Sequence, residues 1–231
     1  MKRTPEPEVM DDEEEVRAYR EGDFRRVNRL CARRALRAAG KPRGRAIDLG
    51  TGPAEIPIHL CEMAPGWNVT AVDASPEMLR AARENVLRSG LARRIRLLRG
   101  DAKRVQGLRP GFDLVLSNSL LHHLEDPLPF WKEVARLAAP GGAVCIQDLF
   151  RPTSRAETLR LVKRHTIGAS PLLRQLFHQS LLAAFTPEEV RAQLAAAGME
   201  GLSVRKVSDR HMAVTGTPRP SNGRRAVRSG R

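Results

Sequence analysis

Residues 47–55, Ile-Asp-Leu-Gly-Thr-Gly-Pro-Ala-Glu, constrain this chain more than any other stretch. The apolar pair Ile47 and Leu49 precedes the glycines, and apolar residues at helical spacing follow from Ile56 to Met63. Glycine tolerates positive φ and lets the backbone come close to a ligand. The start of a helix offers free backbone N–H groups to an anion. The stretch therefore predicts a strand, a glycine turn and a helix that together bind a nucleotide.

Strand and helix patterns alternate along the middle of the chain. The expected strands are residues 45–49, 68–73, 95–99, 113–117 and 143–148. The expected helices between them lie near residues 54–63, 76–88 and 128–138, the second with Ser75 as N-cap and Pro76 in the first turn. Such alternation predicts an α/β fold in which helices cover both faces of a parallel sheet.

The pattern changes on both sides of this core. Residues 11–39 predict one or two amphipathic helices, and residues 151–185 predict two more. We expect both groups to form a lid over the strand ends. A capping box at Thr186-Pro187-Glu188-Glu189 begins a further helix, and residues 201–207 and 211–215 predict an antiparallel hairpin.

The domain prediction is a single unit over residues 11–216. A disordered acidic segment is expected at residues 1–10, and a flexible basic tail at residues 217–231. No internal repeat divides the chain.

The charge distribution leaves two interpretations open. The formal net charge is +14, yet residues 1–15 hold seven acidic residues against Lys2 and Arg3, so the remainder carries +19. Such an excess can attract nucleic acid or anionic metabolites. Alternatively, it reflects arginines spread over solvated helix faces. Nine aromatic residues are few for stacking single-stranded bases.

Composition also bears on the compartment. No apolar run approaches the roughly 18–20 residues that span a bilayer, and no apolar signal region follows Met1. Cys31, Cys61 and Cys145 lack paired or metal-type spacing and are expected to be buried thiols. These features predict a cytoplasmic protein without a membrane segment.

Polar residues stand at the ends of the expected strands, where open α/β sheets bind their ligands. Asp48 lies beside the glycine turn at the first strand end. Asp73 at the second end suits a ribose diol, and Asp101 after the third is placed to accept from an adenine amino group. The fourth strand ends in Ser117-Asn118 and leads into Leu-Leu-His-His-Leu at residues 120–124.

In these motifs, over residues 45–150, the chain resembles the class I S-adenosylmethionine-dependent methyltransferases. The resemblance implies a Rossmann-like, seven-stranded, mostly parallel sheet with an antiparallel C-terminal hairpin. It implies S-adenosyl-L-methionine as cofactor and S-adenosyl-L-homocysteine as product. The cofactor-binding residues that it carries over are Asp48, Gly50, Thr51, Gly52, Asp73, Ala74, Met78, Asp101, Ala102, Ser117 and Asn118.

One position departs from the family pattern, because Ala54 stands where a third glycine is common. Alanine is small enough for close packing of helix and strand, so cofactor binding is expected to survive. The rival interpretation is a nicotinamide-binding domain, which predicts Gly-x-Gly-x-x-Gly. That interpretation explains neither Asp101 nor the closing hairpin.

His123 and His122 are the candidate bases, because they follow the fourth strand where the acceptor should lie. Asp148, at the end of the fifth strand, is the third candidate catalytic residue. Alternatively, these histidines are structural and Asp148 caps a turn or pairs with Arg151. Methyl transfer from a sulfonium mainly requires alignment, and a base only where the acceptor loses a proton. No metal site is predicted.

Four further residues are weaker candidates for lining the acceptor site. His165 and His178 lie in the inserted helices, where a surface or interhelical role is the alternative. Tyr19 and Arg20 lie in the N-terminal helices and can reach the same region if those helices form a lid.

Three functions remain open. The first is transfer of a methyl group to an O, N or C atom of a small-molecule acceptor, which the 120–124 run and the lid favour. The second is methylation of RNA or another polyanion, favoured by the basic body and tail. The third is a catalytically silent, cofactor-binding partner protein. A monomer and a homodimer are both compatible with the sequence.

Overall fold

The computed structural model of the protein describes residues 1–9 and 12–220. Seven strands form one sheet in the order β3-β2-β1-β4-β5-β7-β6. β1 to β5 run parallel, and β7 is antiparallel to both of its neighbours. The strands are β1 Arg43–Leu49, β2 Gly66–Asp73, β3 Ile95–Arg99, β4 Phe112–Asn118, β5 Ala138–Leu149, β6 Met199–Lys206 and β7 His211–Pro220. The predicted seven-stranded, mostly parallel fold with its closing hairpin is confirmed.

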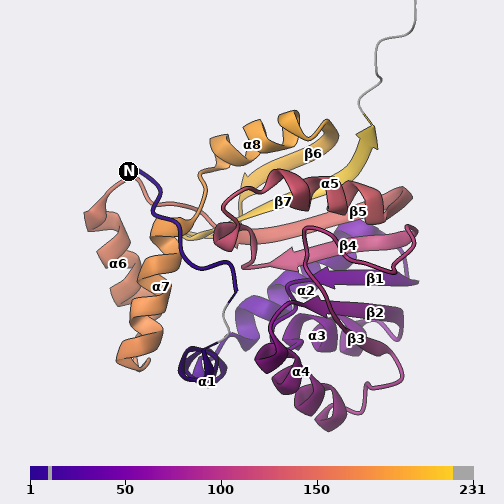
Figure 1. Ribbon diagram of the computed structural model, residues 1–231, viewed down its shortest axis with the longest axis horizontal. Coiled ribbons are helices and arrows are strands. Elements are labelled where there is room, and N and C mark those ends of the chain that lie inside the picture. The colour runs from indigo at the N-terminus through magenta and orange to yellow at the C-terminus, as the bar shows by residue number, and fades with distance from the viewer. Residues whose placement is uncertain (10–11, 221–231) are drawn as a thin grey trace, which may run out of the picture.

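Helices cover both faces of the sheet and one of its edges (Figure 1). They are α1 Glu13–Glu21, α2 Arg25–Ala39, α3 Glu55–Met63, α4 Pro76–Arg88, α5 Leu128–Leu137, α6 Arg155–His165, α7 Pro171–Ala183 and α8 Pro187–Ala196. A short 3₁₀ helix, η1 Leu121–His123, follows β4. Side-chain caps fix where two of the helices begin. The Ser75 hydroxyl accepts from Met78 N at the start of α4, and Thr186 and Glu189 form the expected capping box at the start of α8.

Alternation along the strands divides the core into two layers, because successive strand side chains point to opposite faces. Ile47, Val115 and Ile146 join one buried cluster with residues of α5 and α8. Ala46, Leu114 and Cys145 join the other with residues of α2, α3 and α4. Covering both faces lets the central strands be almost wholly apolar.

All three cysteines are fully buried in the second layer as free thiols, as expected. No helix among the described residues is long and apolar enough to cross a membrane.

The lid is a separate small cluster at the carboxyl ends of the parallel strands. Leu149 packs there with Leu161, Val162, Leu181 and Ala184 of the segment from α6 to the end of α7. In Figure 1, α6 and α7 stand at this edge of the sheet, and α1 lies below them. The lid therefore covers the edge at which ligands bind in open α/β sheets. Residues 25–39, also expected in the lid, instead form α2 and pack on one face of the sheet.

Both chain ends differ from expectation where the structure describes them. Residues 1–9 were expected to be disordered, but they run along α7 and bond to the body of the domain (Figure 1). Arg3 explains this, because its guanidinium donates to the carbonyls of His122, Leu124 and Ala183. Residues 217–220, expected in the tail, extend β7 along β6, and the remaining tail lies outside the described residues.

Ala54 adopts the left-handed conformation, with φ 61°, immediately before α3. An L-residue there costs roughly 1–2 kcal/mol, which Ala54→Gly removes. The same change loses a buried methyl worth about 0.8 kcal/mol and adds unfolded-state entropy of about 0.4–1 kcal/mol. We therefore expect Ala54→Gly to change the free energy of unfolding by less than about 1 kcal/mol in urea denaturation.

The control is Ala82→Gly, because Ala82 is equally buried but lies inside α4. That change loses the methyl and about 1 kcal/mol of helix propensity with no strain to relieve. It should cost about 2 kcal/mol. Equal losses in the two variants would contradict the presence of strain at Ala54.

Candidate functional site

The glycine turn after β1 is held against β2 by the backbone. Gly50 N and Thr51 N both donate to Val72 O, at 2.9 and 2.8 Å. Gly50 has a φ of 72°, and a Cβ there would lie 2.8 Å from Leu120 Cδ1. Only glycine satisfies both the conformation and the space.

Two carboxylates border the turn, that of Asp48, which is buried, and that of Asp73, which is half-buried. The Asp73 carboxylate accepts from Gly52 N at 2.7 Å and from Ser75 N at 2.9 Å, so it links the turn to the start of α4. Asp48 accepts from the Thr51 hydroxyl at 2.7 Å through Oδ2. Its Oδ1 is buried and has no hydrogen-bond partner among the described residues. Burial, with smaller repulsion from Asp73, raises the pKa of Asp48 to about 7.

A cavity of about 210 Å³, the glycine-turn cavity, opens over these groups. Ten of the eleven predicted cofactor-binding residues line it: Asp48, Gly50, Thr51, Gly52, Asp73, Ala74, Met78, Asp101, Ala102 and Asn118. The exception is Ser117, which is fully buried and donates to Leu49 O at 2.6 Å. Ser117 thus ties β4 to β1 and does not line the cavity.

The residues of this cavity fit S-adenosylmethionine. Asp48 Oδ1 is a buried acceptor without a donor, which a ligand ammonium can satisfy. Asp73 lies at the end of β2, where hydroxyl donors of a ribose can reach its carboxylate. Gly52 leaves open space above the turn, because a Cβ there would meet only Met78 Sδ, at 3.9 Å.

A second cavity of about 440 Å³, the lid cavity, lies between the N-terminal helices and the inserted helices. Phe24, Val27, Leu173, Leu176 and Phe177 give it an apolar wall, and His165, Arg210 and His211 give it a polar end. Five residues line both cavities: Tyr19, Asn28, Asn118, Ser119 and His123. The two cavities therefore meet at the end of β4.

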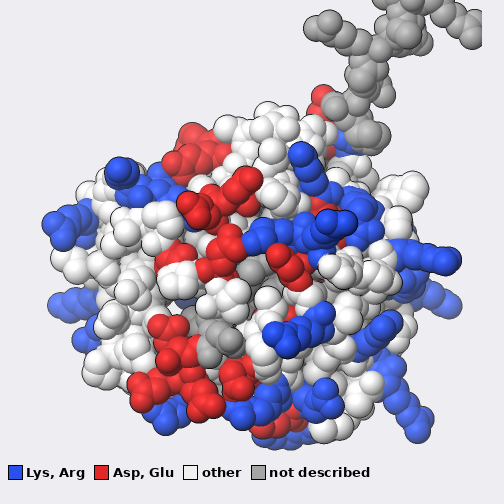
Figure 2. All heavy atoms as spheres, viewed as in Figure 1, with Lys and Arg blue, Asp and Glu red and all other residues white. Residues whose placement is uncertain are grey.

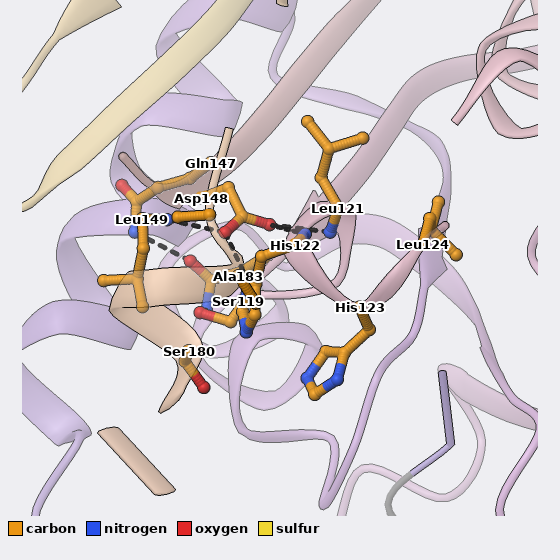
Figure 3. Close-up of polar contacts among 12 residues, drawn as sticks. Ser119, Leu121, His122, His123, Leu124, Gln147, Asp148, Leu149, Ser180 and Ala183 are labelled. Carbon is orange, nitrogen blue, oxygen red and sulfur yellow. Dashed lines mark hydrogen bonds and ion pairs between the residues drawn. The ribbon is translucent and has the colours of Figure 1, made fainter. Parts of the chain in front are cut away.

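Asp148 and His122 form a buried pair behind this junction. His122 Nδ1 lies 2.5 Å from Asp148 Oδ1, and Asp148 Oδ2 accepts from Leu121 N at 2.6 Å. Figure 3 shows the Asp148 carboxylate between the Leu121 backbone and the His122 ring. Burial opposes both charges, but their attraction and hydrogen bond outweigh it, so the pKa of Asp148 is lowered and that of His122 raised.

His123 is the histidine that reaches both cavities. Its ring points away from Asp148 (Figure 3), and its Nδ1 lies 3.0 Å from Pro7 O. Burial, followed by the charge of His122, lowers the pKa of His123 to about 4. Burial therefore makes His123 the harder of the two histidines to protonate, whereas the Asp148 carboxylate raises the pKa of His122 above its ordinary value.

Residues 1–9, called here the N-terminal strap, cross the same region. Arg3 lies 4.0 Å from the Phe185 ring centroid in addition to its three carbonyl contacts. Glu6 Oε1 lies 3.3 Å from His122 Nε2 and 3.2 Å from His123 Nδ1. Glu8 pairs with Lys103 and lines the glycine-turn cavity.

Sequence reasoning missed several residues of the junction. Asn28 is buried and donates to Glu55 at 2.5 Å, and a polar residue on the apolar face of a helix was the available signal. Ser119 has a φ of 55°, a strained conformation that no local motif announces. Gln147 accepts from Arg34 and donates to Asn118 Oδ1 at 2.8 Å, which orients Asn118.

Of the four weaker candidates for the acceptor site, Tyr19 and His165 line a cavity and His178 lines neither. Tyr19 stacks on Phe24 and lines both cavities, and burial raises its pKa. His165 lines the lid cavity and lies 2.8 Å from Asp209. His178 lines neither of the two cavities. The side chain of Arg20 lies outside the described part of the chain.

The charge of Asp48 provides a test of the glycine-turn geometry. Because its pKa is raised on folding, ionisation of Asp48 destabilises the fold as the pH rises from about 4 to about 7. Asp48→Asn removes that loss. In the cofactor-free protein we expect the variant to gain stability over the native chain between pH 5 and pH 8, by up to about 4 kcal/mol.

Thermal unfolding at each pH measures this difference. Asp113→Asn is the control with the opposite sign, because the hydrogen bond from Lys41 lowers the pKa of Asp113. That variant should lose stability above about pH 4. If the difference in stability between Asp48→Asn and the native chain does not change with pH, the Asp48 carboxylate does not have a pKa raised by burial.

Comparison with known proteins shows which proteins this chain is similar to. Residues 47–146 match the family model of the methyltransferase domain. The chain is 31% identical over 157 residues to the ubiquinone biosynthesis O-methyltransferase of Caulobacter sp. strain K31, covering 65% of this chain and 57% of that protein. It is 26% identical over 175 residues to the demethylmenaquinone methyltransferase of Roseiflexus sp. strain RS-1, covering 71% of each. The chain thus spans just over half the length of the Caulobacter protein.

A solved structure agrees in fold. The crystal structure of a SAM-dependent methyltransferase from Aquifex aeolicus has a TM-score of 0.67 and 20% identity, over 89% of this chain and 98% of that one. The matched region begins at Ile47 and so includes the glycine turn, Asp73, Asp101 and the end of β4. In its motifs and in its fold, the chain is similar to the class I S-adenosylmethionine-dependent methyltransferases.

Proposed function

We propose that this protein transfers a methyl group from S-adenosylmethionine to an O, N or C atom of a small-molecule acceptor. The observation that carries the proposal is the junction of the two cavities at Asn118, Ser119 and His123. A donor held in one cavity and an acceptor held in the other meet there. Alignment of reacting groups is the main contribution that a protein makes to such a displacement.

The glycine-turn cavity is proposed to hold the cofactor, which supplies an electrophilic methyl group when bound. Asp48 and the turn at Gly50–Gly52 hold its methionine part, and Asp73 accepts hydrogen bonds from its ribose hydroxyls. Asp101 and Ala102 face the adenine, with Met78 packed beside it. These roles rest on the family resemblance and on the positions of the residues around one cavity.

The lid cavity is proposed to hold the acceptor. Its apolar wall of Phe24, Leu173 and Phe177 suits an apolar ring or chain. The names of two relatives refer to ubiquinone biosynthesis and demethylmenaquinone. An aromatic or quinol-like acceptor is therefore the first class to test.

His122, His123 and Asp148 are proposed to prepare the acceptor for attack. His122 and His123 line the lid cavity, and Asp148 positions His122 through the bond at Nδ1. His123 is one of the five residues that line both cavities, and the neighbouring His122 has the Asp148 carboxylate at its Nδ1.

The surface supports a small acceptor over a polyanion. Figure 2 shows acidic side chains in patches over the centre and left of the face seen in Figure 1, with Lys and Arg at its margins and across its right half. Glu13, Glu14 and Glu15 begin α1, whose Tyr19 lines both cavities. Acidic residues on a helix that borders both cavities repel a phosphate backbone.

Binding of S-adenosylhomocysteine, measured by calorimetry, tests the cofactor assignment. We expect Asp73→Ala to weaken binding at least tenfold, because charge-assisted hydrogen bonds contribute about 1.5–3 kcal/mol each. Asp113→Ala is the matched control, since that aspartate bonds to Lys41 and Arg45 N away from the cavity. Equal affinity in both variants, or preferential binding of NADH, would refute the assignment.

Transfer of labelled methyl groups to a panel of phenols and quinols tests the acceptor class. Turnover of a neutral small acceptor should be nearly independent of salt between 50 and 300 mM. Transfer to RNA that falls steeply over the same range would instead indicate recognition through phosphate contacts. Cofactor binding without transfer to either class would favour a catalytically silent partner protein.

A further inference from the structure

Three metal-ligating side chains from two distant parts of the sequence converge beside the lid cavity. Glu6 comes from the N-terminal strap, and His122 and His123 come from η1. Glu6 Oε1 lies 3.3 Å from His122 Nε2 and 3.2 Å from His123 Nδ1. Among the described residues this is the one group of three or more such side chains whose ligand atoms all lie within 4.8 Å of one another.

We propose that Glu6, His122 and His123 bind a divalent transition-metal ion of the zinc type. Zinc takes imidazole nitrogen at about 2.0–2.1 Å and carboxylate oxygen at about 2.0–2.2 Å. Two ligand atoms of a tetrahedral site with such bonds are about 3.4 Å apart. Both separations from Glu6 agree with that spacing, and all three ligand atoms lie within 4.8 Å of one another, so a small movement brings the three around one ion.

The surroundings of His122 provide a second observation. Its Nδ1 bonds to Asp148 Oδ1 at 2.5 Å, which leaves Nε2 directed toward Glu6. A carboxylate on the far nitrogen is the usual partner of a metal-bound histidine, because it fixes the ring and its tautomer. Asp148 is itself held by Leu121 N and Leu149 N, both at 2.6 Å.

A hydrogen-bonded cluster without metal is the competing explanation. In that case either His122 carries protons on both nitrogens and donates to Asp148 and Glu6 at once, or a protonated Glu6 donates to Nε2 of a neutral His122. Glu6 also accepts from Ser180 at 3.2 Å, and His123 Nδ1 also lies 3.0 Å from Pro7 O. A bound ion takes the place of a proton at His122 Nε2. It also takes the place of the Pro7 contact at His123 Nδ1, so each histidine gains a coordinate bond.

The position of the site gives it a use that rests on the proposed function. Three protein ligands leave a coordination position open, as in catalytic zinc sites. His122 and His123 both line the lid cavity, so that position is available to an acceptor oxygen. An acceptor hydroxyl bound to the ion loses its proton to water more readily, which makes it a better nucleophile. The histidine pair then acts as a ligand set and not as a free base.

The ion also connects the strap to the site. Glu6 is the ligand that the strap supplies, and Arg3 and Glu8 fasten the strap on either side of it. Metal binding therefore stabilises the strap across the wall of the lid cavity.

The experiment titrates Co²⁺ into protein that has been treated with a chelator and dialysed, and records the visible d–d absorption. We expect one Co²⁺ per chain, displaced by one Zn²⁺. Glu6→Gln and His123→Gln should each weaken the affinity at least tenfold. The control is Glu62→Gln, because Glu62 and His59 form a surface carboxylate–histidine pair at 3.1 Å. That variant should bind as the native chain does.

Binding of S-adenosylhomocysteine to the same samples separates the possible failures. A variant that binds S-adenosylhomocysteine normally is folded, so its loss of Co²⁺ is a loss of ligands. Native protein without a saturable Co²⁺ site would overturn the metal proposal, and so would binding that Glu6→Gln and His123→Gln leave unchanged. A Co²⁺ site in a chain that does not bind S-adenosylhomocysteine would support the metal proposal and refute the proposed function alone.

Discussion

The parallel arrangement of β1 to β5 is the constraint on which the site depends. Parallel strands end on the same side of a sheet, so the residues after β1, β2, β3 and β4 lie along one edge. The same arrangement buries both faces under helices, which leaves this edge as the place for polar groups. The parallel arrangement thus brings Asp48, Asp73, Asp101 and Asn118 to one cavity, although they are far apart in the sequence.

The loop after β4 depends on a second interaction, the buried carboxylate of Asp148. Its two oxygens bond to Leu121 N, Leu149 N and His122 Nδ1, so the end of β5 holds η1 in place. This directs His123 toward both cavities and His122 toward the strap. A carboxylate that was a candidate catalytic residue thus serves first as a support for the two histidines.

The fold and the cofactor side could be predicted because each signal is local. Asp48, Gly50 and Gly52 lie within five residues, and both glycines adopt the positive φ that the motif predicts. Apolar alternation likewise predicts which strand residues are buried on each face. Ser117 shows the limit: its position in the motif was correct, but its side chain faces inward to Leu49 O and not toward the cavity. Whether a strand-end residue points into the core depends on one step of the pleat.

The sequence by itself determined the resemblance to a methyltransferase family, the polar residues at the ends of the strands and the residues around the glycine turn. The tertiary structure alone decided that Asn28 and Ser119 complete the junction and that residues 1–9 lie against the lid. It also brought Glu6 beside His122 and His123. The physical reason is how far apart in the sequence the contacting residues lie. Turns and amphipathic elements are set by neighbours a few residues apart, whereas the strap is held by an arginine whose partners lie more than a hundred residues away.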